Sequence, residues 1–338
     1  MAETMQALTY FGEGDVRADS RSKPTIPDPT DAIIRIDTTT ICEAVQNFKP
    51  GDKVLISCVS RCGACENCQK QLYSHCQNGG SWILGYMIDG ALSEYVRTPF
   101  ADTSLYHLPD RLDKEVAVFL SDALPTGHEI GVQYGEVKPG SDIMIAGAGP
   151  VGMGVLLTSQ FYSPATITVV DMDDNRLAKA REMGATHTVN PANDDVSARV
   201  AEITDGRGVD TADDVSARVA EITDGRGVDT AIEAVGLPAT WKTCAANVKE
   251  GGNIAVVGVH GKPVEFQLQD MWIKNLTVTT GLVNANTTGV LIKAVQNSDL
   301  SITSLPTHHF TWDQLDQAWE TFSHADTHQA MKVIIDNP

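Results

Sequence analysis

Hydrophobic residues are spaced differently in the N-terminal third of the chain and in the part that follows. The N-terminal third holds short stretches of mixed apolar and polar residues between turns, such as MQALTYF and DAIIRIDTTT, which predict β-strands. From about Asp142 onward, nearly continuous apolar runs such as SDIMIAGAG alternate with helical patterns such as DNRLAKAREMG. This alternation predicts an α/β fold, in which helices cover both faces of a parallel sheet.

The length of the chain predicts two domains, because 338 residues exceed what one hydrophobic core usually organises. The stretch from Asn286 to Pro338 contains two helical patterns and a final strand, AMKVIID. We expect this tail to pack against the N-terminal domain.

A tandem duplication interrupts the α/β half. Residues 194–212 (DDVSARVAEITDGRGVDTA) recur letter for letter at 213–231. One identical pair is not a repeat architecture, which is built from many divergent units. Each copy predicts a helix followed by the start of a strand, but only the second continues into IEAVG. Because a parallel crossover normally holds one helix, we expect one copy to pack and the other to be displaced onto the surface.

Composition and charge restrict the classes of partner. Hydrophobic residues make up 42% of the chain, which excludes general disorder. Acidic residues outnumber basic ones by 44 to 25, and a net charge of −19 disfavours nucleic-acid binding. This acidity fits either a solvated surface or adaptation to a salty cytoplasm. No apolar run is long enough to cross a membrane and the N-terminus lacks a signal-peptide pattern, so we expect a soluble, cytoplasmic protein.

A glycine-rich turn is the first motif with a chemical function. The pattern G-x-G-x-x-G begins at Gly147, follows a strand, opens a helix and ends at Gly152, 19 residues before Asp171 at the end of the next strand. In this context it predicts a dinucleotide-binding loop, in which Gly149 lets the pyrophosphate approach and Gly152 lets helix and strand pack. Asp171 would bind ribose hydroxyls and repel a 2′-phosphate, so we expect NAD rather than NADP, with Arg176 assisting. A glycine turn of another doubly wound fold is the alternative.

Five of the seven cysteines lie between Cys58 and Cys76. Cys62, Cys65 and Cys68 follow the spacing C-x-x-C-x-x-C. With Cys76 they supply four thiolates, the ligand set of a closed structural zinc site. Iron–sulfur ligation is the alternative for the same spacing. The other cysteine of the cluster, Cys58, is expected to be a packed residue.

At this point the chain resembles the zinc-dependent alcohol dehydrogenases of the medium-chain dehydrogenase family, closest to the bacterial and archaeal short-chain or secondary alcohol type. The resemblance covers nearly the whole chain and is carried by segments that match in order and spacing. These are TTTIC, GDKVLISCVSRCGACENC, GGSWILGYMIDGALSEYV, FADTSLYHLPD, LSDALPTG, GAGPVG, VVDMDDNR, AIEAVG and VGVHGKP.

The resemblance implies a GroES-like β-barrel catalytic domain formed by residues 1–123 and 283–338, and a Rossmann NAD-binding domain over residues 124–282. It implies hydride transfer between NAD and a small alcohol, aldehyde or ketone, in a homodimer or homotetramer. It also implies further cofactor-binding positions besides the glycines, Asp171 and Arg176. These are Thr126, Pro150, Val151, Val235, Gly258 and Val259.

The same resemblance places two ligands of a catalytic zinc, at Cys42 and Asp122. The third ligand of the family, the His of a G-H-E motif, is missing from its expected place after Cys42, because Cys42 is followed at once by a stretch that normally lies a few dozen residues later; the one G-H-E of the chain lies after Asp122 and contains His128. Ala44 occupies the position of the proton-relay hydroxyl. Neither Glu43 nor His128 is expected to replace the ligand; His128 lies six residues after Asp122, so on a helix the two would not face one metal.

These observations favour an NAD-dependent oxidoreductase of the zinc alcohol dehydrogenase type with an incomplete catalytic zinc site. A catalytically inactive NAD-binding protein of the same fold is one alternative. A zinc-independent medium-chain reductase is another, which the four-cysteine segment disfavours.

Overall fold

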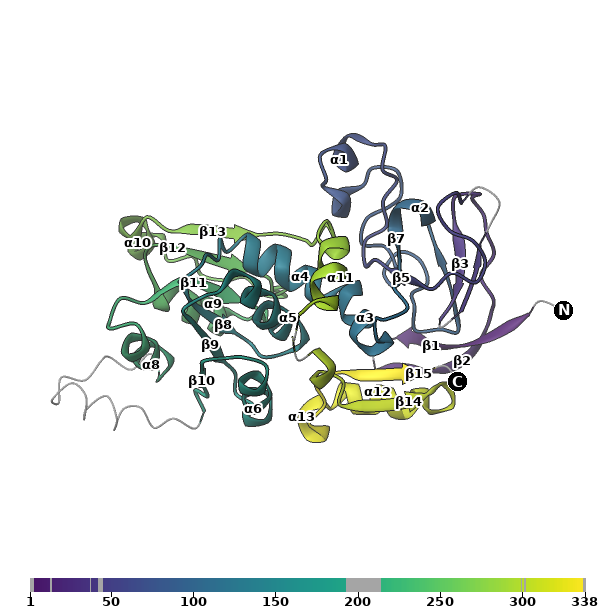
Figure 1. Cartoon of the computed structure of the whole chain (residues 1–338). Coiled ribbons are helices and arrows are strands. Elements are labelled where there is room, and N and C mark those ends of the chain that lie inside the picture. The colour runs from purple at the N-terminus through teal and green to yellow at the C-terminus, as the bar shows by residue number, and fades with distance from the viewer. Residues whose placement is uncertain are drawn as a thin grey trace. The chain divides into compact units, whose positions relative to one another are not determined.

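The computed structural model describes residues 3–12, 14–36, 38–41, 45–192, 214–298, 300 and 302–336 (Figure 1). The chain separates into two compact units. Unit 1 comprises Met1–Pro125, Val283–Asp299 and Leu305–Pro338, so both chain ends contribute to it. Unit 2 comprises Thr126–Leu282 and Leu300–Ser304. Cys42, Glu43 and Ala44 lie outside the described residues.

Unit 2 is built on a six-stranded sheet in the order β10-β9-β8-β11-β12-β13, with every adjacent pair parallel. In chain order this is the arrangement 3-2-1-4-5-6 of a doubly wound dinucleotide-binding fold. The order reverses between β8 and β11, where such folds bind ligands. The strands are β8 (Asp142–Ala146), β9 (Thr166–Val170), β10 (His187–Val189), β11 (Val228–Glu233), β12 (Val248–Val256) and β13 (Thr277–Thr280).

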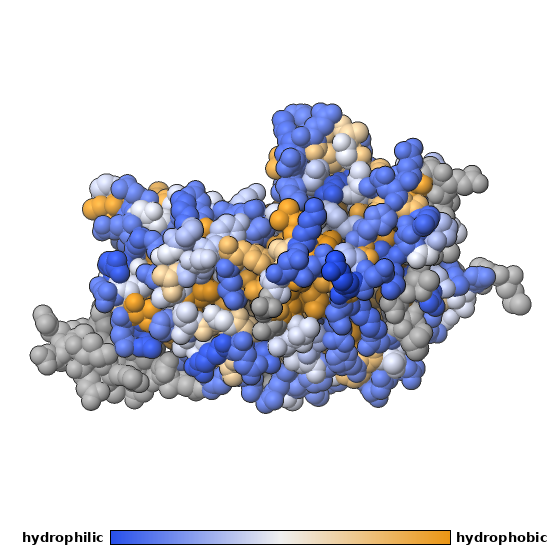
Figure 2. All heavy atoms as spheres, in the orientation of Figure 1, coloured by the Kyte–Doolittle hydropathy of each residue, from blue (hydrophilic) through white to orange (hydrophobic). Residues whose placement is uncertain are grey.

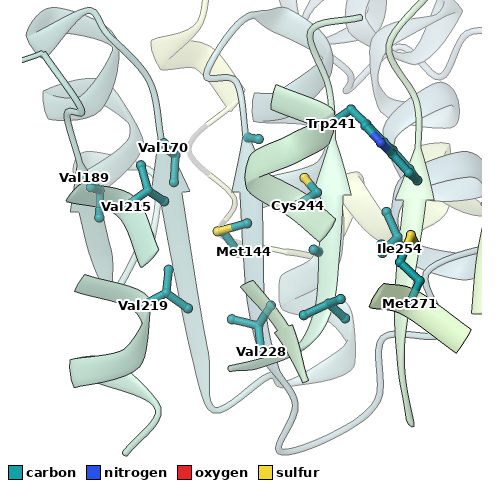
Figure 3. Packing of buried hydrophobic residues seen from close by; sticks show 13 residues of the cluster. Met144, Val170, Val189, Val215, Val219, Val228, Trp241, Cys244, Ile254 and Met271 are labelled. Carbon is teal, nitrogen blue, oxygen red and sulfur yellow. The ribbon is translucent and has the colours of Figure 1, made fainter. Parts of the chain in front are cut away.

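Helices cover both faces of this sheet because its strands are apolar on both sides. Ile143 and Ile145 alternate with Met144 and Ala146 along β8, and all four are buried. Met144 and Ala146 face a core to which three helices contribute, among them α9 with Trp241 (Figure 3). The helices of unit 2 are η2 (Gly127–Gln133), α5 (Pro150–Ser159), η3 (Gln160–Tyr162), α6 (Asp174–Glu182), α8 (Asp214–Ile222), α9 (Pro238–Asn247), α10 (Leu268–Met271), η4 (Trp272–Lys274) and η5 (Ile302–Ser304).

The second copy of the duplicated segment fills the crossover before β11. Its helix, α8, buries Val215 and Val219 in the core of Figure 3, and the chain then enters β11 at Val228. The expectation that one copy packs is therefore confirmed for residues 214–231. The first copy, 194–212, lies outside the described residues, so its predicted displacement stays a prediction.

Unit 1 consists of small sheets rather than one large one. An antiparallel ribbon, a three-stranded antiparallel sheet β4-β3-β6, an antiparallel pair β5-β7 and a parallel pair β14-β15 account for its strands. Ile34, Phe48, Val96 and Leu105 belong to a common core. The strands are β1 (Thr4–Gly12), β2 (Asp15–Ser22), β3 (Ala32–Arg35), β4 (Thr38–Ile41), β5 (Val54–Ile56), β6 (Tyr95–Thr98), β7 (Leu105–His107), β14 (His308–Thr311) and β15 (Val333–Asp336).

The described helices of unit 1 are short, and the longest of them contain 9 residues. Hydrophilic residues dominate the visible face in Figure 2, in keeping with the net charge of −19. No helix in the described ranges is long and apolar enough to span a membrane. The helices are α1 (Glu66–Gln69), η1 (Tyr73–His75), α2 (Ala101–Ser104), α3 (Lys114–Ser121), α4 (Ala123–Thr126, ending at the first residue of unit 2), α11 (Thr288–Gln296), η6 (Trp312–Gln314), α12 (Leu315–Ser323) and α13 (Ala325–His328).

Candidate functional site

The glycine-rich loop joins β8 to α5 at the carboxyl edge of the unit 2 sheet. Gly147 has a φ of +109°, a left-handed conformation that favours glycine. A Cβ added to Gly152 would lie 1.9 Å from the Gly147 carbonyl oxygen, so only glycine lets the helix start so close to the strand. A Cβ at Gly149 would meet no atom within 4 Å. The backbone beside Gly149 is therefore open to a ligand.

The start of α5 supplies hydrogen-bond donors to that space. Gly149 is the N-cap and Pro150 is the first helical residue, a position where its missing N–H costs nothing. The N–H groups of Val151 and Gly152 belong to the first turn, which has no partners within the helix. These groups and the positive end of the helix dipole suit a phosphate.

Asp171 is held rigidly beside this loop at the end of β9. One carboxylate oxygen accepts a hydrogen bond from the N–H of Ala148 at 2.7 Å, and the other accepts one from the N–H of Asp173 at 2.9 Å. Each oxygen keeps a further lone pair that can accept a hydrogen bond from a hydroxyl group. Arg176 forms an ion pair with Asp173, with 3.7 Å between Nε and the carboxylate. The structure thus brings Gly147, Gly149, Gly152 and Asp171 together around the start of α5.

A buried carboxylate, Glu233, holds the loop that follows β11. Glu233 is fully buried, and one of its oxygens accepts hydrogen bonds from the N–H groups of Val235 (3.0 Å) and Gly236 (2.8 Å). Its other oxygen lies 3.2 Å from Nε2 of His260. Sequence reasoning missed Glu233 and His260. The available signal was the single charged residue inside the run TAIEAVG.

The remaining predicted cofactor positions lie on loops of the same unit. Gly258 packs against Gly236, since a Cβ at Gly258 would lie 2.2 Å from the Gly236 nitrogen. Val235 and Val259 are exposed hydrophobic residues, 43% and 91% accessible. Such exposed apolar side chains at a loop edge are available to contact a flat ring of a ligand. Thr126 ends α4 and immediately precedes η2.

His128 is a buried residue of η2 rather than a metal ligand. Its Nε2 lies 3.0 Å from the Tyr162 hydroxyl, and burial lowers the pKa of the imidazole to about 4. The histidine is therefore neutral at physiological pH. His128 is thus a packed side chain with a polar partner.

The four cysteines of the C-x-x-C-x-x-C segment converge in unit 1. The sulfurs of Cys62, Cys65, Cys68 and Cys76 all lie within 4.8 Å of one another, and those of Cys62 and Cys68 are 3.9 Å apart. Four sulfurs around one zinc ion, each at about 2.3 Å, would be separated by about 3.8 Å. The arrangement therefore has the size of a site for one ion.

Backbone N–H groups favour the thiolate form of one of these cysteines. The N–H groups of Gln77 and Cys68 donate to the Cys65 sulfur at 3.4 and 3.5 Å and lower the pKa of this thiol to about 6. Burial, together with hydrogen bonding to Cys65, raises the pKa of the Cys68 thiol to about 12. A divalent cation would stabilise all four groups as thiolates.

Asp122 lies directly after α3, and its negative charge acts on the nearby Lys332. Lys332 is largely buried; burial lowers the pKa of its ammonium group, and the negative charge of Asp122 opposes that shift. Within the described residues, the four cysteines are the only group of three or more candidate metal ligands. Asp122 therefore has no pair of described ligands beside it, and Cys42 lies outside those residues.

A cavity of about 820 Å³ opens beside this part of unit 1. Strands β3, β5 and β15 and helix α3 line it, and Ser121 and Lys332 are among the lining residues. Most of its wall is apolar, with residues such as Leu55 and Ile334. No described histidine lines the cavity.

Comparison with known proteins adds the family to this geometry. Residues 32–110 match the model of the alcohol dehydrogenase GroES-like domain, and residues 150–217 and 209–297 match that of zinc-binding dehydrogenases. The solved zinc-dependent alcohol dehydrogenase 2 of Streptococcus pneumonia is 43% identical, with 98% of each chain covered and a TM-score of 0.85. The chain belongs to the zinc-dependent alcohol dehydrogenase family.

Curated relatives agree with this assignment. An alcohol dehydrogenase of Cupriavidus necator is 26% identical over 375 residues and covers 96% of both chains. An uncharacterized zinc-type alcohol dehydrogenase-like protein of Escherichia coli K12 is 30% identical over 82% of this chain and 73% of its own length. This alcohol dehydrogenase is thus a medium-chain oxidoreductase with a GroES-like and a Rossmann part, and the predicted family and fold class are confirmed.

The duplication also marks the match to the zinc-binding dehydrogenase model. The two matched stretches overlap over residues 209–217, at the junction of the two copies. The zinc-binding dehydrogenase model is thus matched in two overlapping pieces at the duplicated segment.

Proposed function

We propose that this alcohol dehydrogenase binds NAD in unit 2 and one structural zinc ion in unit 1, and that its turnover of alcohols is severely impaired. The observation that carries the proposal is the loop around Gly147 and Gly149 with the fixed carboxylate of Asp171 beside it. Bound NAD would supply a hydride acceptor for a small alcohol, or a donor for the aldehyde or ketone in reverse.

The chain's own residues would bind and orient the dinucleotide. The first turn of α5, with Pro150, Val151 and Gly152, would receive the pyrophosphate. Asp171 would accept hydrogen bonds from the ribose hydroxyls and repel a 2′-phosphate, which favours NAD over NADP.

The loops that follow β11 and β12 would complete the nucleotide site. Val235, Gly258 and Val259 would border it, and Glu233 would fix their backbone through its hydrogen bonds. We infer that Arg176, already paired with Asp173, shapes the ribose end, and that Thr126 contributes from the start of the unit.

The four thiols of Cys62, Cys65, Cys68 and Cys76 would hold zinc with no open coordination position. Such a site stabilises its segment and takes no part in chemistry. The distances between the sulfurs favour one ion over an iron–sulfur cluster.

The family's catalytic zinc does not fit the residues present. A catalytic zinc takes three protein ligands and one open position, and the chain offers Cys42 and Asp122. The buried ammonium of Lys332 near Asp122 would further oppose a cation there. We therefore derive no step through this metal. An inactive NAD-binding protein remains the second candidate, favoured by the same missing ligand.

Three further properties complete the proposal. Small alcohols and the matching aldehydes or ketones are the substrate class, and a homodimer or homotetramer is the assembly that the family resemblance implies. A cytoplasmic location is supported by the six described cysteines, none of which forms a disulfide.

Calorimetric titration with NAD and NADP, followed by alcohol oxidation at saturating NAD, tests the proposal. We expect NAD to bind more tightly than NADP, while turnover falls orders of magnitude below the usual range of about 1–1000 per second. Inserting a family-like segment with G-H-E between Cys42 and Glu43 should raise the rate. Equal affinity for both cofactors, or ordinary turnover by the unmodified chain, would contradict it.

A further inference from the structure

A second cavity lies within unit 1, and none of the four clustered cysteines lines it. Its volume is about 410 Å³, within the range of about 300–1000 Å³ of small-molecule sites. Arg61, Tyr73 and Tyr106 form one side, and Gly289 and Lys293 of α11 form the other. Segments more than 200 residues apart in sequence thus meet around one space.

The guanidinium group of Arg61 is held in place by aromatic neighbours. Its Cζ lies 4.3 Å from the ring centre of Tyr73 and 5.6 Å from that of Tyr106. Its Nη2 donates a hydrogen bond to the Tyr106 hydroxyl at 3.0 Å, and that hydroxyl donates to the carbonyl oxygen of Ala285, also at 3.0 Å. The orientation of the cation is therefore set before any ligand arrives.

The other terminal nitrogen of Arg61 has no partner. Nη1 is buried and forms no hydrogen bond with any described residue. A buried charged donor left without an acceptor is costly, so such groups are normally paired. An acceptor from a ligand would remove that cost.

The charges around the cavity all have one sign. Its lining contains the two cations Arg61 and Lys293 and no aspartate or glutamate. Neither cation forms an ion pair with a described residue, although acidic residues outnumber basic ones by 44 to 25 in the chain. Two unneutralised cations facing one cavity in so acidic a protein favour an anionic occupant.

We propose that this cavity binds a small organic anion through a carboxylate or phosphate group, with Arg61 and Lys293 as the charged contacts. The planar guanidinium matches either group through hydrogen bonds from a fixed direction, and the exposed Lys293 adds a mobile point charge. The cavity exceeds the size of inorganic phosphate, so the anionic group would carry a small organic part. The site is independent of the proposed dehydrogenase function.

Isothermal titration of the zinc-loaded protein with glycerol 3-phosphate and with succinate tests this proposal and distinguishes phosphate from carboxylate. We expect one saturable site per chain for at least one probe. Lys293→Gln should weaken binding about 10-fold or more, the effect of losing a contact to a charged group. Arg61→Lys, which keeps the charge but loses the planar set of N–H donors, should also weaken binding.

Two exposed cations elsewhere serve as controls, Lys242→Gln and Arg111→Gln, and should leave the affinity unchanged. Zinc content is measured in each variant, so that damage to the neighbouring cysteines is detected. Because Lys293 is exposed on α11, its variant should fold normally. Absence of saturable binding up to a probe concentration of about 10 mM would overturn the proposal, because this concentration is well above the dissociation constant of about 1 mM of a weak specific complex. Equal weakening by the control variants, or no weakening by Lys293→Gln, would do the same.

Discussion

At the residue scale, the nucleotide site shows what motif spacing reveals and what it misses. The pattern from Gly147 to Gly152 and its distance to Asp171 predict the loop, because each position has a steric or hydrogen-bonding requirement that few residue types meet. The roles of Glu233 and Lys332 were not predictable in this way. Their partners, backbone N–H groups for Glu233 and Asp122 for Lys332, are brought near by the tertiary fold.

Replacing Asp171 by Ser should weaken NAD binding by on the order of 1–3 kcal/mol, the contribution of a hydrogen bond to a charged group. The affinity for NADP should fall less, because the charge that repels the 2′-phosphate is removed as well. Calorimetric titration measures both affinities. Asp270→Ser, at an exposed position of unit 2, is the matched control and should change neither. A variant that keeps the full NAD preference would show that another residue selects the cofactor.

His128 predicts a pH dependence of stability. Burial lowers the pKa of its imidazole from 6.5 to about 4 in the folded state. The unfolded chain therefore binds more protons between these values, and stability falls as the pH drops from about 6.5 to 4, by about 3 kcal/mol in total. Denaturant unfolding across this range should show a smaller slope in His128→Gln than in the wild type. The exposed-site variant His328→Gln should keep the wild-type slope; equal slopes in both variants would refute the prediction.

At the element scale, the hydrophobic periodicity predicted which segments form strands and which form helices better than it predicted which strands pair with each other. The apolar runs that became β8 and β9 indicate buried parallel strands, and continuity with IEAVG identifies the second duplicated copy as the one that enters β11. The small sheets of unit 1 were less predictable. Strands of three or four residues, such as β5 and β7, carry too few positions to specify their partners.

The duplication offers a prediction with an internal control, since Val200 and Val219 occupy the same position in identical copies. Val219 is buried in the core of unit 2, so Val219→Ala should destabilise the fold by about 2 kcal/mol. If one crossover accepts one helix, Val200→Ala should change the free energy of unfolding by less than about 0.5 kcal/mol. Chemical denaturation compares the two variants. Equal losses would mean that both copies are packed.

At the scale of the whole molecule, the chain combines a Rossmann sheet in the order 3-2-1-4-5-6 with a GroES-like part. The family and the fold follow from local patterns that occur in the right order along the chain. Which side chains meet at the catalytic metal site does not follow in this way, because Cys42 lies outside the described residues. Within those residues Asp122 has the largely buried Lys332 near it and no pair of candidate metal ligands.

The number of zinc ions per chain tests the central claim most directly. Elemental analysis of protein purified with zinc present should give one zinc per chain, lost in Cys65→Ser together with a lower melting temperature. Ser substitution at Cys244, a buried cysteine outside the cluster, should keep the metal. Two zinc ions per chain would contradict the claim, because a second ion would require a rebuilt catalytic site. A count that is unchanged in Cys65→Ser would equally contradict it, because the four cysteines would then not hold the ion.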